Sequence, residues 1–492
     1  MQIVPPDPSR YVGLTFSPSG DYVYFTRFET RLVSNVYRIP VLGGTPQLVI
    51  SDVDGPISFS PDGSRFAFIQ GNTSRNEVSV LVAPADGSSE PRRLATRPMV
   101  GGYTLFTRAA WSPDGKTIAV AVGGQTWIGS GIAGDVVIVG FDVASGRERP
   151  IVTGRWDSIA NLDWLSNGSL IVSGAELGHS NNQLWRVSLD GTIRRVTHDL
   201  NTYSDVAGAA KAPVIVTVLG DLSSTISAWA ADDSSLTPVT SGPGRYDGQE
   251  GMVWTPDGHL IFTSGVGGQS DLWLIDAHGS NAHQLTANAG TPRMVDVTPD
   301  GNSTLFVAVR DGQPGIWRLT FADNKIARLT DGIHDVFPLC LPDNRSFLFT
   351  RFEPTPHLYR ESFGGKPEQI PDLNTLAVAA SRDGRTVATL SVEKKPEAID
   401  AVPLDGHQDT RRYDILNAPV MVTWTPSNDG LTFLESRSGP PSLWNQPISG
   451  GPPRELLNLH GERIFSFAWS QDGHLAIARG PVPTDVVLIS MN

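Results

Sequence analysis

The stretch WTPDGHLIFT at residues Trp254–Thr263 decides the fold of this 492-residue chain. Its Pro presets φ at the second turn position, its Asp accepts local hydrogen bonds, and its Gly can take a positive φ. These residues together predict a tight turn. The run that follows the turn, His259–Thr263, alternates in the manner of a strand. The stretch therefore predicts two antiparallel strands joined by one turn.

The same turn recurs along the whole chain. Variants stand at 16–20 (FSPSG), 59–63 (FSPDG), 111–115 (WSPDG), 164–168 (WLSNG), 297–301 (VTPDG), 341–344 (LPDN), 381–384 (SRDG), 424–430 (WTPSNDG) and 469–473 (WSQDG). A decayed copy near Ala209–Pro213 completes about eleven copies at a spacing of roughly 43 to 53 residues. A repeat of this length indicates a stack of similar units.

Each copy continues with a third strand and a short fourth strand. The third strand often carries an aromatic residue, as in QLWRV at 183–187, and a fourth strand such as ARLT at 327–330 follows a second turn. Four antiparallel strands every 40 to 50 residues are typical of a β-propeller blade. An eight-stranded sandwich for every two repeats is the alternative, but a sandwich would not keep one motif at one period. We therefore expect an all-β fold of propeller blades.

Eleven blades exceed the four to eight of a usual ring, so two tandem propellers are expected. The chain starts on Gln2-Ile-Val-Pro, which resembles a fourth strand, and ends on a third strand at Asp485–Ile489. We place the boundary in the polar segment Asp232–Ser235, which gives 1–232 as a first propeller of about five blades and 233–492 as a second of about six. A six-plus-five split, a nested pair and one very large ring stay open.

The repeats resemble the TolB-type (WD40-like) β-propeller family over essentially residues 2–489. More narrowly, the chain resembles the C-terminal propeller region of acidobacterial serine/threonine kinases and winged-helix regulators. The matching segments are QIVPP (2–6), GLTFSPSGDYVYF (13–25), RYDG (245–248), SLWNQPISGGPPRELL (442–457) and RIFSFAWSQDGHLAIARG (463–480). The resemblance implies a sensor or interaction part that follows a kinase or DNA-binding domain. The sequence itself carries no kinase motif, so it implies a binding role without kinase activity.

Composition narrows the class of partner. The net charge is −13, which disfavours nucleic acid as a partner. The single cysteine, Cys340, permits no disulfide within the chain, and no apolar run reaches the roughly 18–20 residues of a membrane span. The N-terminal residues MQIVPPDPSR do not resemble a signal peptide. We expect a cytoplasmic protein as the chain stands, or an extracytoplasmic one if the chain is a piece of a membrane-anchored sensor fused to an upstream domain.

The loops between the fourth strand of one blade and the first strand of the next are the candidate binding site. Loops on a rigid scaffold concentrate binding residues, and such inter-blade loops gather at one rim of a propeller channel. The aromatic and charged residues that recur there are Trp156, Asp157, Tyr203, Asp205, Arg245, Tyr246, Asp247, His334, Asp335 and Arg463. They would suit a cationic or peptide ligand. In the alternative reading, each Asp caps its loop and each aromatic residue fills the space between blades.

We therefore expect a non-catalytic binding module, the sensor or protein-interaction part of a bacterial signalling system, with a protein or small polar ligand and no cofactor. Two other classes stay open. One is a propeller enzyme of the lyase or lactonase type with a metal at the channel mouth. The other is a periplasmic TolB-like envelope protein, although that family has an N-terminal α/β domain that this chain lacks.

Overall fold

The structure is a computed structural model. It describes residues 11–29, 33–72, 75–99, 102–123, 136–179, 181–209, 212–220, 223–230, 235–242, 244–266, 269–332, 334–352, 355–371, 373, 376–391, 397–405, 409–415, 421–435, 442–459, 461–481 and 484–491. These residues form strands and turns without an α-helix, arranged as antiparallel blades of up to four strands. The all-β fold of about eleven propeller blades predicted from the sequence is confirmed. Within the described part of the chain, no helix is long and apolar enough to cross a membrane.

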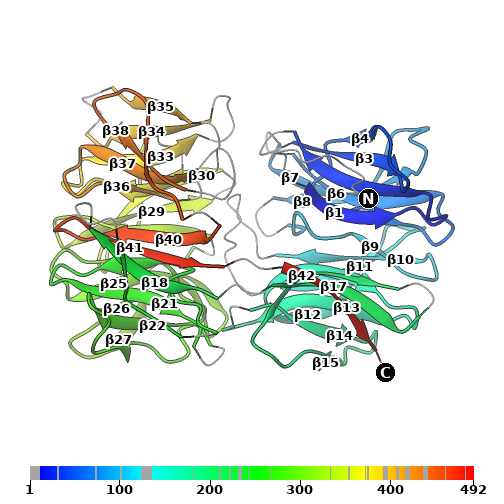
Figure 1. Cartoon of the computed structure of the whole chain (residues 1–492), viewed down its shortest axis with the longest axis horizontal. Coiled ribbons are helices and arrows are strands. Elements are labelled where there is room, and N and C mark those ends of the chain that lie inside the picture. Colours follow the sequence, from blue (N-terminus) through cyan, green and yellow to red (C-terminus); the bar gives the residue numbers. More distant parts are fainter. Residues whose placement is uncertain are drawn as a thin grey trace. The chain divides into compact units, whose positions relative to one another are not determined.

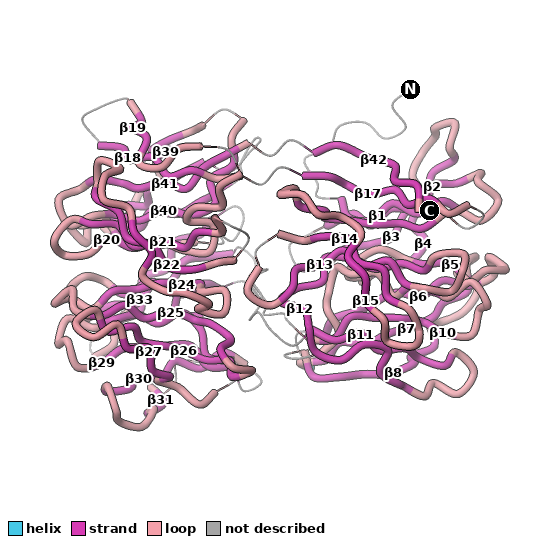
Figure 2. Tube along the Cα trace, turned by 90° about the horizontal axis from the view of Figure 1, so that it is seen from below, coloured by secondary structure: helices cyan, strands magenta, loops and turns pink. Residues whose placement is uncertain are grey.

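The chain divides into two compact units. Unit 1 comprises Met1–Leu177, Asn181–Gly220 and Thr484–Asn492, and unit 2 comprises Gly178–Ser180 and Asp221–Pro483. Figures 1 and 2 show the strands of each unit gathered into blades. We number the blades 1 to 5 in unit 1 and 6 to 11 in unit 2, and list the strands of each from the first strand to the last.

Unit 1 contains five blades. Blade 1 is β1 (Tyr11–Phe16), β2 (Tyr22–Phe28), β3 (Ser34–Pro40) and β4 (Gln47–Ser51); blade 2 is β5 (Ser58–Phe59), β6 (Arg65–Asn72), β7 (Glu77–Pro84) and β8 (Arg92–Pro98). Blade 3 is β9 (Ala110–Trp111), β10 (Thr117–Val122), β11 (Val136–Asp142) and the first part of β12 (Glu148–Trp164). Blade 4 is the second part of β12, then β13 (Leu170–Glu176), β14 (Gln183–Val187) and β15 (Ile193–Arg195); blade 5 is β16 (Thr202–Gly208), β17 (Val214–Gly220) and β42 (Thr484–Ser490).

Unit 2 contains six blades. Blade 6 is β20 (Met252–Trp254), β21 (His259–Ser264), β22 (Asp271–Asp276) and β23 (His283–Gln284); blade 7 is β24 (Arg293–Val297), β25 (Ser303–Arg310), β26 (Gln313–Thr320) and β27 (Lys325–Arg328). Blade 8 is β28 (Asp335–Cys340), β29 (Ser346–Phe352), β30 (Pro356–Ser362) and β31 (Glu368–Gln369); blade 9 is β32 (Leu376–Ala380), β33 (Thr386–Ser391), β34 (Glu397–Pro403) and β35 (Arg411–Ile415). Blade 10 is β36 (Val422–Trp424), β37 (Gly430–Glu435), β38 (Ser442–Pro447) and β39 (Arg454–Leu457); blade 11 is β40 (Arg463–Trp469), β41 (His474–Gly480), β18 (Thr225–Ala230) and β19 (Leu236–Pro238).

Two blades are built from distant parts of the sequence. In blade 11, β18 pairs antiparallel with β41: Thr225 lies opposite Arg479 at one end, and Ala230 lies opposite His474 at the other. In blade 5, β42 pairs with β17 from Gly220–Thr484 to Val214–Ser490, as Figure 2 shows. The chain therefore passes from unit 1 to unit 2 after β17 and returns to unit 1 before β42.

This strand pairing moves the boundary that we placed after residue 232. β18 precedes that residue yet belongs to unit 2, and β42 belongs to unit 1 although it is the last strand of the chain. The cause is that both crossings interrupt a blade between its second and third strands, so neither crossing coincides with a boundary of the sequence repeat. Gln2-Ile-Val-Pro, which resembles a fourth strand, lies outside the described residues.

Apolar clusters join most neighbouring blades. In unit 2, such clusters link blades 6 and 7, 7 and 8, 8 and 9, and 10 and 11. Tyr413 of blade 9 donates its hydroxyl hydrogen bond to Ile448 O of blade 10 over 2.7 Å. The ring closes where blade 11 packs on blade 6, and there Trp254 Nε1 donates to Ala468 O over 3.0 Å. In unit 1, similar clusters link blades 1 to 5 in series.

The repeated turn also packs between blades. In the turn at 60–63, Ser60 Oγ donates to Asp62 Oδ1 over 2.6 Å, and the backbone N–H of Arg65 donates to Ser60 Oγ over 3.0 Å. A Cβ atom on Gly63 would lie 2.9 Å from Cγ of Pro18, and one on Gly384 would lie 2.5 Å from Cδ of Pro342. The glycine of one turn thus lies against the proline of the turn in the preceding blade.

We predict that Gly384→Ala destabilises the protein by about 2–4 kcal/mol. Gly384 has φ +67, so alanine would add backbone strain to its contact with Pro342. Gly258→Ala is the matched control, because Gly258 has φ +87 with nothing within 4 Å of the added Cβ atom. The control should show the cost of strain alone, about 1–2 kcal/mol. Denaturant unfolding measures both, and equal losses would contradict the proposed packing of turn against turn.

Candidate functional site

The turns between first and second strands place a set of aspartates on one end of unit 2, which we call the turn face. Its members are Asp257, Asp300, Asp343, Asp383, Asp429 and Asp472. The side chains of Asp257 and Asp472 are 73% and 72% exposed. Because every blade turns from its first strand to its second at the same end, these carboxylates share one face of the ring.

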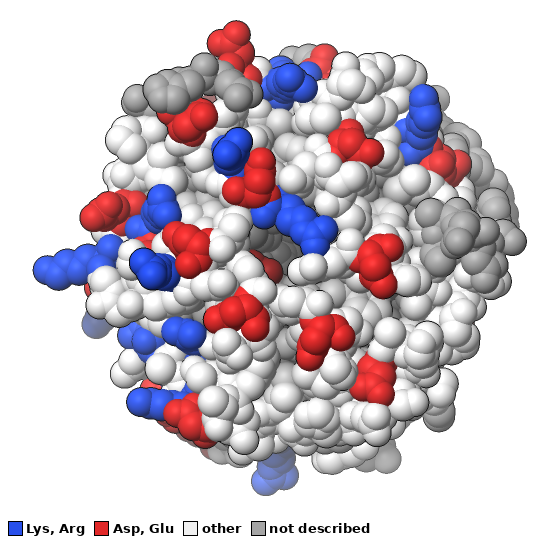
Figure 3. Space-filling model, turned by 90° about the vertical axis from the view of Figure 1, so that its left-hand side faces the viewer, with Lys and Arg blue, Asp and Glu red and all other residues white. Residues whose placement is uncertain are grey.

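Hydrogen bonds keep these carboxylates in their ionised form. The hydroxyl of the turn Ser or Thr, above all, lowers the pKa of Asp257, Asp300, Asp383, Asp429 and Asp472. An exposed carboxylate with a lowered pKa carries its full charge at neutral pH. Figure 3 shows this face, with acidic side chains around a central hollow, a basic side chain at the edge of the hollow and further basic side chains toward one side of the face.

One arginine ties three turns of this face together. Arg382 Nη1 donates to Pro426 O over 3.3 Å and to Gln471 O over 3.5 Å, and the Arg382 backbone N–H donates to Asn428 Oδ1 over 3.0 Å. Arg382 belongs to the turn of blade 9, and its partners belong to the turns of blades 10 and 11. The turns that carry the carboxylates of blades 9, 10 and 11 are therefore held together by hydrogen bonds.

The inter-blade loop candidates of blade 6 are buried and occupied. Asp247 has no exposed surface; its Oδ1 accepts a hydrogen bond from Ser264 Oγ over 2.6 Å, and its Oδ2 pairs with Arg245 Nε. The adjacent Tyr246 is 7% exposed and forms a bridge with Ser224. This arrangement stabilises the loop that leads from blade 11 into blade 6.

The candidates of blade 8 follow the same pattern. Asp335 is 1% exposed and accepts two hydrogen bonds from Arg351, over 2.6 Å from Nε and 2.8 Å from Nη2. Burial lowers the pKa of the neighbouring His334, whose Nδ1 is buried without a hydrogen-bond partner. Arg463, in contrast, is exposed at the start of β40, with its guanidinium 5.1 Å from the centre of the Phe465 ring.

The aromatic candidates of unit 1 lie in the core. Trp156 has no exposed surface, and its ring meets that of Trp185 edge-on with 5.3 Å between centroids. Trp156 pairs with both Val136 and Glu176, at the residue where β12 passes from blade 3 into blade 4. The adjacent Asp157 is 5% exposed. Tyr203 is 4% exposed and donates its hydroxyl hydrogen bond to Asp199 Oδ2 over 2.8 Å.

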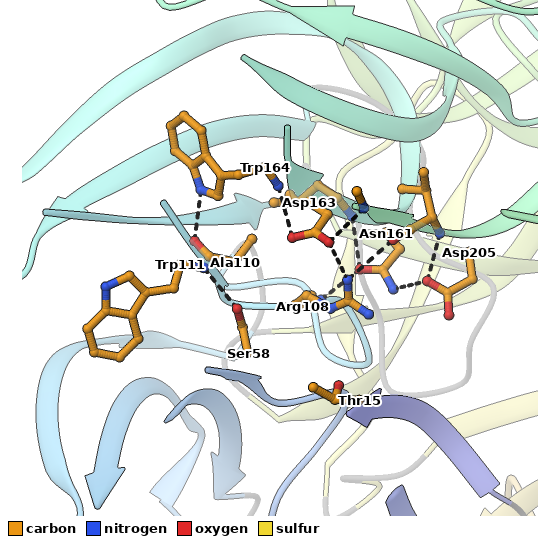
Figure 4. A network of polar contacts seen from close by, with 12 residues as sticks. Thr15, Ser58, Arg108, Ala110, Trp111, Asn161, Asp163, Trp164 and Asp205 are labelled. Atoms are coloured by element: carbon orange, nitrogen blue, oxygen red, sulfur yellow. Dashed lines mark hydrogen bonds and ion pairs between the residues drawn. The ribbon is translucent and has the colours of Figure 1, made fainter. Parts of the chain in front are cut away.

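Asp205 belongs to a polar network between the first strands of blades 3, 4 and 5 (Figure 4). Asn161 Nδ2 donates to Asp205 Oδ1, and Asn161 Oδ1 accepts the backbone N–H of Arg108 over 3.0 Å. Arg108 Nη1 donates to Asp163 Oδ2 over 2.9 Å and to Val206 O over 3.3 Å. Arg108 is only 6% exposed, so one buried guanidinium links three blades.

Burial of the Asp163 carboxylate in this network costs free energy. Burial raises the pKa of Asp163, while the charge of Arg108 and the N–H groups of Gly208 and Trp164 lower it. Gly208 N–H donates to Asp163 Oδ2 over 3.0 Å, and Trp164 N–H donates to Oδ1 over 2.9 Å. Arg108 Nε is buried without a partner. The network therefore depends on the ion pair that it contains.

The candidates predicted from the sequence do not gather into one pocket rim. Most of them are buried beside an arginine, a hydroxyl or an apolar neighbour, and these contacts account for their presence as caps and inter-blade packing. A binding role for them stays a prediction. Sequence reasoning missed Arg108, Asn161, Asp163 and Arg351, since nothing in their local sequence distinguishes a buried charge from an exposed one. In the described part of the chain, no three His, Cys, Asp or Glu side chains are arranged to hold a metal ion.

No family model matches the sequence. An uncharacterized protein of Agrobacterium fabrum is 29% identical over 183 residues, which cover 37% of this chain and 53% of that protein. The chain thus spans about half the length of the curated relative that it matches. The identity is confined to a part of each protein and concerns a relative without a stated activity.

Solved structures similar to this chain include two TolB-type proteins. The one from Agrobacterium tumefaciens is 19% identical, with a TM-score of 0.34 over 60% of this chain and 88% of that chain. The one from Acinetobacter baumannii is 14% identical, with a TM-score of 0.31 over 84% of this chain and 81% of that chain. The fold itself is defined by the strand pairing described above, and none of these comparisons concerns a kinase or a winged-helix regulator.

We predict that Arg108→Met destabilises the protein by about 3–5 kcal/mol, because it leaves Asp163 as an unpaired buried charge. Burial raises the pKa of Asp163, so the folded state binds this proton more tightly than the unfolded state does. The contribution of Asp163 to stability therefore falls as pH rises above about 4, and it should fall more steeply in the variant. Denaturant unfolding at pH 4 to 8 measures this. The double variant Arg108→Met with Asp163→Asn should recover part of the loss; no recovery would contradict the role of the ion pair.

We also predict that Trp156→Ala lowers the free energy of unfolding by about 3–5 kcal/mol, because it opens a cavity between blades 3 and 4. Leu189→Ala is the control, since Leu189 is 58% exposed and its loss should change stability by less than about 0.5 kcal/mol. Thermal and denaturant unfolding measure both. A variant at Trp156 as stable as the wild type would contradict this packing role.

Proposed function

We propose that this protein is a non-catalytic interaction module that captures a cationic segment of a partner protein on the turn face of unit 2. The observation that carries the proposal is the set of ionised turn aspartates on a closed, six-bladed ring. The formal net charge of the whole chain, −13, also favours cationic partners, because it attracts them over a distance.

The two sets of carboxylates in the molecule have different uses. The buried carboxylates of Asp163, Asp247 and Asp335 each pair with an arginine, so their charge is already balanced. On the turn face, Asp257, Asp300, Asp383 and Asp429 accept the turn hydroxyl at Oδ1, as in the 2.6 Å bond from Thr298 Oγ1 to Asp300, which leaves Oδ2 outside that bond. Two members have further partners: Asp472 Oδ2 lies 3.1 Å from His474 Nδ1, and Asp343 Oδ2 accepts from Ser346 and Arg360. A partner that brings Lys or Arg side chains can therefore bind the turn face without disturbing the fold.

The finer role is that of a sensor or protein-interaction part of a bacterial signalling system. It is supported by the resemblance of the repeats to the propeller regions of kinases and winged-helix regulators. A TolB-like envelope protein would share the interaction role and differ in its location. Fusion of this chain to an upstream domain belongs to the same proposal.

An Asp→Asn substitution removes the negative charge of the turn and keeps the side-chain oxygen that accepts the hydrogen bonds of the turn. Asn167 already occupies this position in blade 4, where its Oδ1 accepts the backbone N–H of Ser169 over 3.0 Å. We predict that Asn at positions 257, 300, 383 and 472 together weakens binding of an octalysine peptide by about tenfold or more. The same substitution at Asp62 and Asp114 in unit 1 is the matched control and should leave the affinity unchanged.

Fluorescence anisotropy of a labelled octalysine at low and physiological salt measures this effect. Binding should weaken as salt rises, because exposed charges are screened. Equal affinity of the unit 2 variant and the wild type would overturn the proposal. Loss of affinity in the unit 1 control alone would place the cationic site on the other unit and overturn it as well.

A further inference from the structure

Blade 5 differs from every other blade at its outer edge. The other ten blades end in a fourth strand, which in blade 3 is the first part of β12. In blade 5 the described strands are β16, β17 and β42 in that order, so no described strand covers the outer edge of β42. A strand edge of this kind presents a row of backbone N–H and C=O groups to a further strand.

One face of the same blade is apolar and exposed. β42 pairs Leu488 with Val216 and Val486 with Val218, so these four side chains share one face. Val486 is 74% exposed, Leu488 is 67% exposed and Val216 is 40% exposed. The opposite face packs on blade 4 through buried residues such as Ile215 and Val206. Contiguous exposed apolar residues of this kind mark interaction surfaces.

The edge also lacks the features that keep an edge strand from pairing. β42 reads Thr484-Asp-Val-Val-Leu-Ile-Ser490, which contains one charged residue near its start and no Pro, Gly or Lys. It pairs with β17 in a continuous register over seven residues without a bulge. Regular apolar edges are the ones that pair with another chain.

We propose that β42 pairs antiparallel with the β42 of a second copy of this chain. The strand is self-complementary about Val487. In that register, Val486 lies opposite Leu488 of the second copy, and Thr484 lies opposite Ser490 of the second copy. Apolar residues of the exposed face thus lie opposite apolar ones, and the terminal hydroxyl residues lie opposite each other, which stabilises cross-strand pairs. On the other face Asp485 lies opposite Ile489 of the second copy, so the complementarity is confined to the exposed apolar face. The product is a two-fold symmetric, six-stranded sheet, and such an interface uses the same patch on both copies.

Sedimentation velocity on the full chain over a hundredfold range of concentration tests the proposal. The wild type should form a dimer, and the variant V486E/L488E should sediment as a monomer, because the register places glutamate opposite glutamate. Both positions are exposed, so the circular dichroism spectrum of the variant should match that of the wild type. L42E/L189E is the matched control, since Leu42 and Leu189 are 83% and 58% exposed elsewhere in unit 1. This control should remain a dimer.

A charge-swap mixture then tests the register. V486K/L488K alone should be monomeric, whereas an equimolar mixture with V486E/L488E should form a mixed dimer. A wild-type monomer at every concentration would overturn the proposal. If hydrogen exchange then showed protection of the β42 amides that point away from β17, this chain itself would cover the edge; if those amides were open, the edge would await a different protein. A dimer that persists in both charge variants would overturn the proposal too.

Discussion

Most blades of this protein depend on one hydrogen-bonded turn between their first and second strands. In these turns a Ser or Thr hydroxyl donates to the turn Asp and accepts from the backbone of the second strand, as Ser381 does with Asp383 and Thr386. Gly63 and Gly384 also lie against the proline of the turn in the preceding blade, so there the same residues that bend the chain also set the distance between blades.

The charged groups divide according to this scaffold. Some acidic residues that enter the space between blades pair with arginines, as Asp163 does with Arg108 and Asp335 with Arg351, because an unpaired buried charge is destabilising. Asp296 instead accepts the backbone N–H of Cys340, and burial raises its pKa to about 6. Acidic residues in the turns stay in water and keep their charge. Binding by this protein is therefore expected at the surfaces that the scaffold leaves exposed: the acidic turn face of unit 2 and the apolar edge strand of unit 1.

The local reading of the sequence was accurate where the signal was local. The turn residues, the strand that follows them and the aromatic third strand all lie where the repeat places them, since each depends on neighbours within a few residues. The local signal carries less information about the site. Aromatic and acidic residues such as Trp156 and Asp335 recur in the inter-blade loops, but their burial depends on contacts with other strands, as in the pair of Asp335 with Arg351.

The sequence by itself determined the all-β class, the blade as the repeating unit and the number of blades, because turn chemistry and strand alternation are encoded over short distances. Only the tertiary structure decided how the blades are shared between the units. β18 joins β41, and β42 joins β17, through backbone hydrogen bonds across more than 240 residues. Backbone groups are the same in every residue, so the sequence cannot show which edge a strand will find. The pairing of these strands depends on how the complete blades pack in the tertiary structure.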